Sequence, residues 1–123
     1  LVHLMLIQIR MNKMDEAEES YEKIKHCYSS LPPKKRTQNL LGKFVTAMSN
    51  YMAANIIRGD ADKAIKIWEQ VTGYISLDKL DLSIFLVICD NASCGYFTMG
   101  NYRSALKWLN NILNFKNKHL IKC

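Results

Sequence analysis

The stretch DNASCGYFTMGNYRSALKWLNNILNF, at residues 90–115, contains the pattern that decides the fold. Apolar residues recur in it at helical spacing on both sides of an interruption at Gly100 and Asn101. Glycine readily adopts the left-handed backbone conformation that ends a helix, and asparagine is a good residue to cap the next one. The stretch therefore predicts the end of one helix, a tight turn, and a second helix that folds back on the first.

Two earlier stretches repeat this turn and its second helix. Each of the three units has an alanine, a glycine or asparagine five positions before it, and large apolar residues four and seven positions after it. In chain order the units are Asn12, Ala17, Tyr21 and Ile24; Gly59, Ala64, Trp68 and Val71; and Gly100, Ala105, Leu109 and Ile112. A small alanine lets two backbones approach, and the residue four positions later lies over the same side of the helix, where we expect it to fill the next gap. The pattern predicts three helical hairpins, at about residues 1–30, 36–75 and 81–116, in a single domain spanning residues 1–123.

This pattern resembles the tetratricopeptide repeat, whose second helix carries an alanine, three free positions and then an aromatic residue. The third unit also has Tyr96 nine positions before its alanine, where the family has its tyrosine, whereas the other two units have Gln8 and Asn55 there. The chain departs from the family in lacking its tryptophan, its leucine–glycine pair and its closing proline. Its alanines are 47 and 41 residues apart, against about 34 in the family. The resemblance implies an all-α fold, a right-handed α-α superhelix of about three antiparallel helix pairs with long helices and loops.

The resemblance also implies a binding groove, because the first helices of the family line a concave face that binds peptides. The implied positions lie fifteen, eleven and eight residues before each alanine. They are Val2, Leu6, Ile9, Ser49, Ala53, Ile56, Asp90, Cys94 and Phe97. The carboxylate clamp of chaperone-binding relatives needs lysine, arginine and asparagine at such positions, so the sequence excludes that clamp. We expect the partner to be an apolar helix or peptide, or a flanking repeat of the same protein.

The first predicted helix, at residues 1–10, is apolar on every side, and such a helix is buried on more than one side. We expect it to be covered by a second copy, which would make a homodimer, or by a preceding flank. The sequence begins without methionine and ends at HLIKC, where we expect another helix to start at residues 117–123. We therefore expect the chain to be a fragment of a longer protein. The opening apolar run is too short to cross a bilayer and has no basic leader, so we expect no membrane partner.

Helix-start signals accompany the predicted turns. Asp60 and Asn101 are expected to cap the second helices that follow them, and Asp78 or Asp81 is expected to cap the helix that runs to about Met99. Trp68 is expected in the core.

The net charge of +6 is unevenly distributed. Residues 1–22 carry five acids and two bases, whereas residues 23–123 carry six acids and fifteen bases. Lys34, Lys35 and Arg36 form a basic patch, and Lys116, Lys118 and Lys122 add positive charge near the end. A basic surface can attract nucleic acid or acidic proteins. Aromatic and basic residues are not interleaved on one element, as single-strand binding usually requires, so the sequence favours a solvated surface over a nucleic-acid site.

No catalytic or metal-binding motif is present in the sequence. There is no phosphate-binding loop, nucleophile elbow or dinucleotide fingerprint, and the three histidines belong to different elements. Cys27, Cys89, Cys94 and Cys123 have no C-x-x-C spacing, so we expect buried thiols in a reducing compartment, the cytoplasm. We expect no cofactor and no enzyme activity. The sequence predicts a non-catalytic scaffold or adaptor module; the alternative is a regulatory or nucleic-acid-associated helical domain that uses the basic surface.

Overall fold

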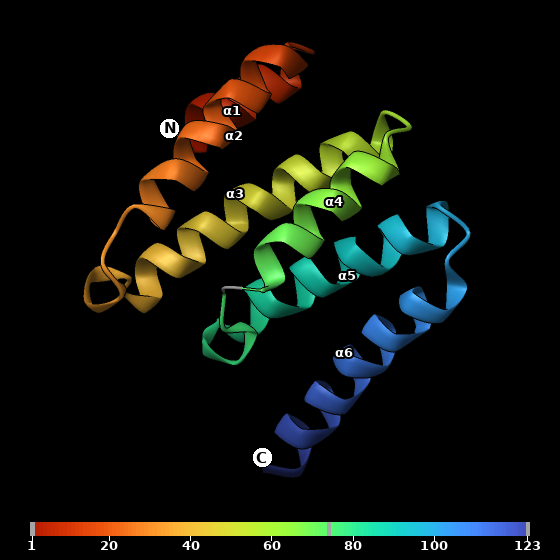
Figure 1. Ribbon diagram of the computed structural model, residues 1–123. Coiled ribbons are helices and arrows are strands. Elements are labelled where there is room, and N and C mark those ends of the chain that lie inside the picture. The colour runs from red at the N-terminus through yellow and green to blue at the C-terminus, as the bar shows by residue number, and fades with distance from the viewer. Residues whose placement is uncertain (1, 74, 123) are drawn as a thin grey trace.

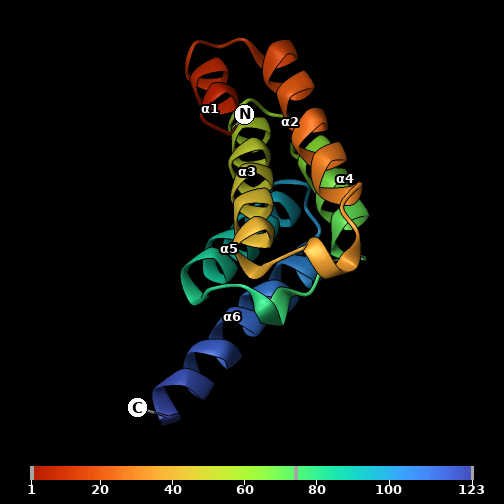
Figure 2. The ribbon, with the colours of Figure 1, turned by 90° about the vertical axis from the view of Figure 1, so that its left-hand side faces the viewer.

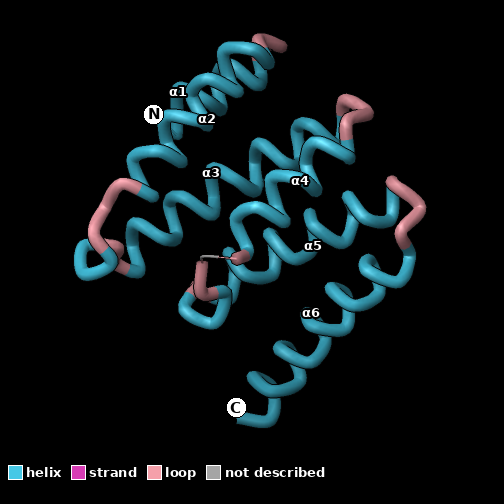
Figure 3. The backbone as a smooth tube through the Cα atoms, in the orientation of Figure 1, coloured by secondary structure: helices cyan, strands magenta, loops and turns pink. Residues whose placement is uncertain are grey.

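The computed structural model describes residues 2–73 and 75–122, with side chains through residue 114. Six α-helices account for most of them: α1 Val2–Arg10, α2 Met14–Ser29, α3 Gln38–Ile57, α4 Ala61–Thr72, α5 Leu82–Thr98 and α6 Tyr102–Lys122. Two short 3-10 helices, Pro33–Lys35 and Leu77–Lys79, lie in the connections before α3 and α5. The described part of the chain contains no strand (Figure 3), which confirms the all-α fold.

The helices form three hairpins that stack on one another (Figure 1). The pairs α1–α2, α3–α4 and α5–α6 each pack together, while α3 also packs on α1 and α2, and α5 also packs on α3 and α4. The first helices α1, α3 and α5 lie on one side of the stack, and α2 and α4 lie on the other (Figure 2). Each new hairpin therefore begins with a helix laid against the hairpin before it. The handedness of a superhelix stays a prediction.

The three hairpin turns share one geometry. The helix-ending residue has a positive φ in each: 62° at Asn12, 86° at Gly59 and 81° at Gly100. The next amide donates a hydrogen bond to the carbonyl oxygen five residues back, from Lys13 to Gln8 at 2.8 Å, from Asp60 to Asn55 at 2.8 Å and from Asn101 to Tyr96 at 2.9 Å. This bond joins the residues around a left-handed helix end and satisfies a carbonyl that the helix leaves without a partner. The predicted break residues are confirmed.

The predicted helix caps are confirmed at two turns and wrong at a third. An Oδ1 oxygen accepts from the amide three residues later at Asp60 and at Asn101, each at 3.2 Å. Asp81 precedes α5, but its side chain makes no capping hydrogen bond among the described residues, and Asp78 lies inside a 3-10 helix. The start of α3 is capped instead by Thr37, whose Oγ1 accepts from the Leu40 amide at 3.2 Å.

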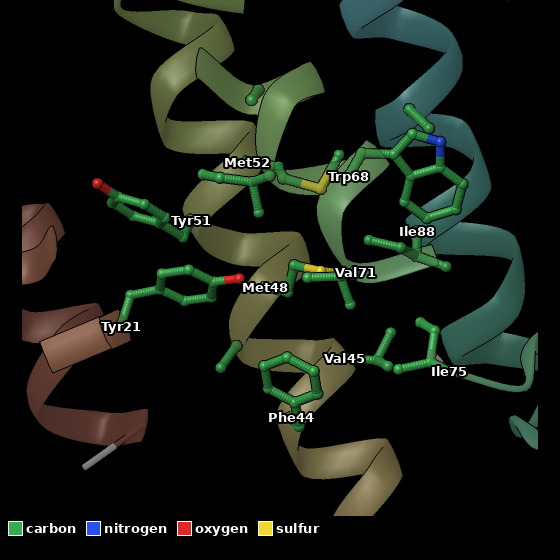
Figure 4. Close-up of a cluster of buried hydrophobic side chains, with 14 of the residues drawn as sticks. Tyr21, Phe44, Val45, Met48, Tyr51, Met52, Trp68, Val71, Ile75 and Ile88 are labelled. Atoms are coloured by element: carbon green, nitrogen blue, oxygen red, sulfur yellow. The ribbon is translucent and has the colours of Figure 1, made fainter. Parts of the chain in front are cut away.

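The core is centred on α3 (Figure 4). This helix contributes Phe44, Val45, Met48, Tyr51 and Met52, all buried, and Figure 4 shows them between α2 and the helices α4 and α5. The second helices fill the gaps beside it with aromatic rings. Tyr21 of α2 stacks on Tyr51 at 4.8 Å, Tyr28 stacks on Phe44 at 4.8 Å, and Trp68 of α4 meets Trp108 of α6 edge-on at 4.8 Å. The expectation that Trp68 is a core residue is confirmed.

The third hairpin departs from the predicted pattern in two ways. Its alanine, Ala105, is buried like Ala17 and Ala64, but Leu109 is 42% exposed instead of filling a gap. The helix α6 also continues without a break to Lys122, so the prediction of a separate helix at residues 117–123 is wrong. Cys123 lies outside the described residues.

The first helix is buried only in part. Met5 is fully buried and Val2, Leu6 and Ile9 are partly covered, whereas Leu4 is 47% and Ile7 is 55% exposed. The helix therefore finds cover on one side within the described residues, and its other side remains apolar and open.

Candidate partner-binding surface

One side of α5 carries an exposed row of side chains at Val87, Asp90, Cys94 and Phe97. Their spacing of three, four and three residues places them along a single side of the helix. Val87 is 54% exposed and Phe97 is 65% exposed, so large apolar groups face water on both sides of the Asp90 carboxylate. The Phe97 ring also lies 5.4 Å from that of Tyr102 at the start of α6.

Polar contacts on the other sides of α5 fix the direction of this row. Asn91 Nδ2 donates to Ser49 Oγ on α3 at 2.6 Å, and Ser93 Oγ donates to the Ala105 carbonyl oxygen on α6 at 3.2 Å. Tyr96 Oη donates to Glu69 Oε1 on α4 at 3.0 Å. These contacts tie α5 to three neighbouring helices and leave its exposed row on the side that faces solvent.

The phenol of Tyr96 is buried, and its pKa lies above the ordinary value of tyrosine. Burial raises the pKa of Tyr96 to about 12, and the hydrogen bond to Glu69 adds to the effect. The phenol therefore keeps its proton at neutral pH and continues to donate to the carboxylate.

A groove of about 510 Å³ lies between α1, α3 and the start of α5. It is lined by Val2, His3, Gln38, Asn39, Gly42, Lys43, Thr46, Asp81 and Ile84. A smaller hollow of about 190 Å³ shares Thr46 and Ile84 with it and reaches Val87 of the α5 row. The groove, the hollow and the row form one continuous area, which we call the first-helix surface.

Close helix packing limits how deep this surface is. A Cβ added at Gly42 of α3 would lie 3.3 Å from Ile84 Cδ1 of α5, so the Ile84 side chain packs closely on the α3 backbone in the groove that both residues line. Lys43 and Asp81 are exposed and place one charge of each sign at the groove. The mouth of the groove is therefore polar, whereas the row on α5 is mainly apolar.

The structure brings the predicted groove positions together only on α5. Asp90, Cys94 and Phe97 are exposed there, while Val2, Leu6 and Ile9 on α1 are half-buried. On α3, Ser49 is buried in its contact with Asn91, and Ile56 is half-buried against α5 near Gly95. Of the nine positions, only Val2 and Ser49 line a groove or hollow.

On α3, sequence reasoning identified only Ala53 of the side that faces outward. The exposed or half-exposed side of that helix runs through Thr46, Asn50, Ala53 and Ile57, and Ile57 is 83% exposed. Apolar residues lie on nearly every side of α3, so hydrophobic periodicity did not distinguish the outer side from the inner ones. The polar residues Thr46 and Asn50 were the available signal.

The three residues of the basic patch differ in their surroundings: Arg36 is held by hydrogen bonds, whereas Lys34 and Lys35 are exposed. Arg36 Nε donates to the Leu31 carbonyl oxygen at 2.9 Å, and one of its terminal nitrogens donates to the Ser29 carbonyl oxygen at 2.8 Å. Its guanidinium also lies 5.5 Å from the centre of the Tyr28 ring. Arg36 therefore closes the loop between α2 and α3, whereas Lys34 and Lys35 extend into solvent.

The cysteines differ in burial, although all of them were expected to be buried. Cys89 is fully buried on α5, and burial raises the pKa of its thiol to about 12, so it stays protonated at neutral pH. Cys27 and Cys94 are exposed free thiols, so the expectation of buried cysteines is wrong for these two. Among the described residues, no three His, Cys, Asp or Glu side chains come together as metal ligands would.

Within the same part of the chain, none of the helices combines the length and the apolar character that crossing a membrane requires. Comparisons with protein-family models, with curated proteins and with solved structures find no match to this chain.

Proposed function

We propose that the chain is a non-catalytic, tetratricopeptide-like interaction module that binds an apolar helix or peptide of a protein partner on its first-helix surface. The exposed row on α5 carries this proposal. Fully burying a valine or phenylalanine side chain stabilises a complex by about 1.5–3 kcal/mol. Val87 and Phe97 are each more than half exposed, so a partner that covers them gains a large part of this free energy.

The polar groups of the surface suit orientation of such a partner. Asp90 lies between the two apolar residues of the row, and Lys43 and Asp81 lie at the groove. A helix with apolar residues spaced three or four apart and a basic residue opposite Asp90 would match this arrangement. Because α5 is held by three other helices, little order has to be created on binding, which favours affinity.

The exposed thiols support the cytoplasm as the compartment. Cys27 and Cys94 are free, and such thiols persist in a reducing environment. Nucleic-acid binding remains the alternative function, since Lys34 and Lys35 are exposed in a chain with a net charge of +6.

The test is recovery of partners from a cell lysate at low and at high salt by the wild-type chain and three variants. Val87→Asp places a charge in the α5 row and should reduce partner retention by about tenfold or more. Leu109→Asp is the matched control, because it replaces an exposed apolar residue on α6, outside the first-helix surface. The third variant, Lys34→Glu with Lys35→Glu, removes the exposed basic residues.

Retention of one protein at high salt, lost only in Val87→Asp, supports the proposed function. Phosphate contacts release counterions, so nucleic-acid binding weakens steeply as salt rises. A defined RNA or DNA that is bound equally by Val87→Asp and lost in the lysine variant would contradict the proposal.

A further inference from the structure

Both ends of the hairpin stack expose an apolar helix face. At one end, Leu4, Ile7 and Met11 lie on the outer side of α1 and its turn and are 47%, 55% and 58% exposed; we call them the head face. At the other end, α6 exposes Tyr102, Leu106, Leu109 and Leu113 to 63%, 58%, 42% and 56%; we call them the tail face. Both sets have the three- and four-residue spacing of one helix side.

Inside the chain, each of the two junctions between successive hairpins shows one close contact whose place can be counted in sequence from the alanines. In the first of these contacts, Tyr21, four positions after Ala17, stacks on Tyr51, thirteen positions before Ala64. A second contact has its own spacing. It joins Ile65, one position after Ala64, to Gly95, ten positions before Ala105. The two residues are so close that a Cβ added at Gly95 would lie 2.7 Å from Ile65 Cδ1.

The same spacing relates the two open ends. The residue four after Ala105 is Leu109, and the residue thirteen before Ala17 is Leu4. Likewise, Leu106 follows Ala105 by one position, and Ile7 precedes Ala17 by ten. These four residues occupy the positions that form contacts between hairpins inside the chain. All four have large apolar side chains, and all four are exposed.

We propose that the head face of one copy of this chain binds the tail face of another. Within one chain, α3 lies against the hairpin α1–α2, and α5 lies against the hairpin α3–α4. In the proposed contact, α1 of the second copy lies in the same way against the hairpin α5–α6 of the first. Leu4 of the second copy then meets Leu109, and Ile7 of the second copy meets Leu106. Because the two faces are different, the contact is heterologous and leaves a free head and a free tail, so it extends beyond a dimer.

Charge disfavours one of the contacts between like ends, tail against tail. The head hairpin, residues 1–30, contains five acids and four bases and is therefore nearly neutral. The α6 segment Tyr102–Lys122 contains five Lys and Arg residues and no acid. Two tail helices therefore repel each other, whereas a tail helix meets a nearly neutral head hairpin without this repulsion, which disfavours the tail-to-tail contact.

The experiment uses two variants of the 123-residue chain in sedimentation velocity at rising concentration. The head variant is Leu4→Asp with Ile7→Asp, and the tail variant is Leu106→Asp with Leu109→Asp. The wild type should form species larger than a dimer, and each variant alone should sediment as a monomer. An equimolar mixture should form a dimer and nothing larger, because only one intact head and one intact tail remain.

Three outcomes would overturn the proposal: a wild type that stays monomeric at every concentration, a tail variant that still associates through α1 alone, or a mixture that does not recover the dimer. Helix content by circular dichroism checks folding, and Ile7→Ser and Leu109→Ser replace the double variants if either unfolds. Val87→Asp, on the first-helix surface, is the control and should associate as the wild type does. Its behaviour separates this proposal from the proposed partner binding, since neither result depends on the other.

Discussion

The second and third hairpins follow the same sequence pattern but differ in how their second helices are buried. Gly59 and Gly100 have φ angles of 86° and 81°, and Ala64 and Ala105 are 0% and 4% exposed. Four residues further on, Trp68 is 1% exposed, whereas Leu109 is 42% exposed. The helix α4 is covered by α5, while the corresponding side of α6 faces solvent. Local sequence therefore determines the hairpin, and the next hairpin determines whether its outer residue becomes core.

The largest expected effect tests this difference directly. Trp68→Ala should lower the free energy of unfolding by about 3–5 kcal/mol, because it leaves a cavity between α4, α5 and α6. Leu109→Ala, at the equivalent position of the third hairpin, should change it by no more than about 0.5 kcal/mol. Urea denaturation of both variants, at a concentration where the wild type is monomeric, gives the comparison. Equal losses would show that Leu109 is covered in solution.

The next prediction concerns the alanine that is buried in both hairpins. Ala64→Leu and Ala105→Leu should each lower the free energy of unfolding by about 1–3 kcal/mol, since both alanines are buried and a larger side chain would overpack their surroundings. Urea melts provide the measurement. A neutral Ala64→Leu would mean that this alanine is not at a close contact.

A smaller effect should be the same in both hairpins. Gly59→Ala and Gly100→Ala force alanine into a left-handed conformation, which costs about 1–2 kcal/mol. Gly73 ends α4 with an ordinary φ of −70° and has open space where a Cβ would be added. Gly73→Ala is therefore the control and should be neutral or slightly stabilising when thermal melts of the three variants are compared.

The smallest effect compares two thiols on α5. Burial raises the pKa of Cys89 from 9.0 to about 12, so its contribution to stability is complete below about pH 9 and is lost as the pH rises towards 12. Between about pH 8 and pH 10, the wild type should lose about 1 kcal/mol more than Cys89→Ala does. Cys94→Ala, at an exposed site of the same helix, should keep the loss seen in the wild type. Urea melts of the reduced protein at the two pH values make the measurement, and parallel losses in all three chains would contradict it.

Features that depend on a few neighbouring residues were predictable. Asn12, Gly59 and Gly100 end helices with positive φ, and Asp60 and Asn101 cap the helices that follow. A cap or a left-handed residue is stabilised by bonds within one turn, so its signal is fully contained in the local sequence.

Features that depend on residues outside a single helical turn were not predictable. Arg36 was assigned to a basic patch, but carbonyl oxygens and an aromatic ring from α2 and the following loop fix it in place. The contact of Ser49 with Asn91, 42 residues away in sequence, also had no signal in the local pattern. The outer side of α3 likewise depends on the helices that pack against its other sides.

The sequence by itself determined that this chain folds into helical hairpins with left-handed turns and buried alanines, because hydrogen bonding and steric fit within a turn involve residues close together in the chain. Only the tertiary structure decided which apolar side chains become core and which stay exposed. That choice depends on whether another helix covers them: Tyr21 and Trp68 are covered by the next hairpin, whereas Leu109 and Phe97 remain exposed and available for a partner.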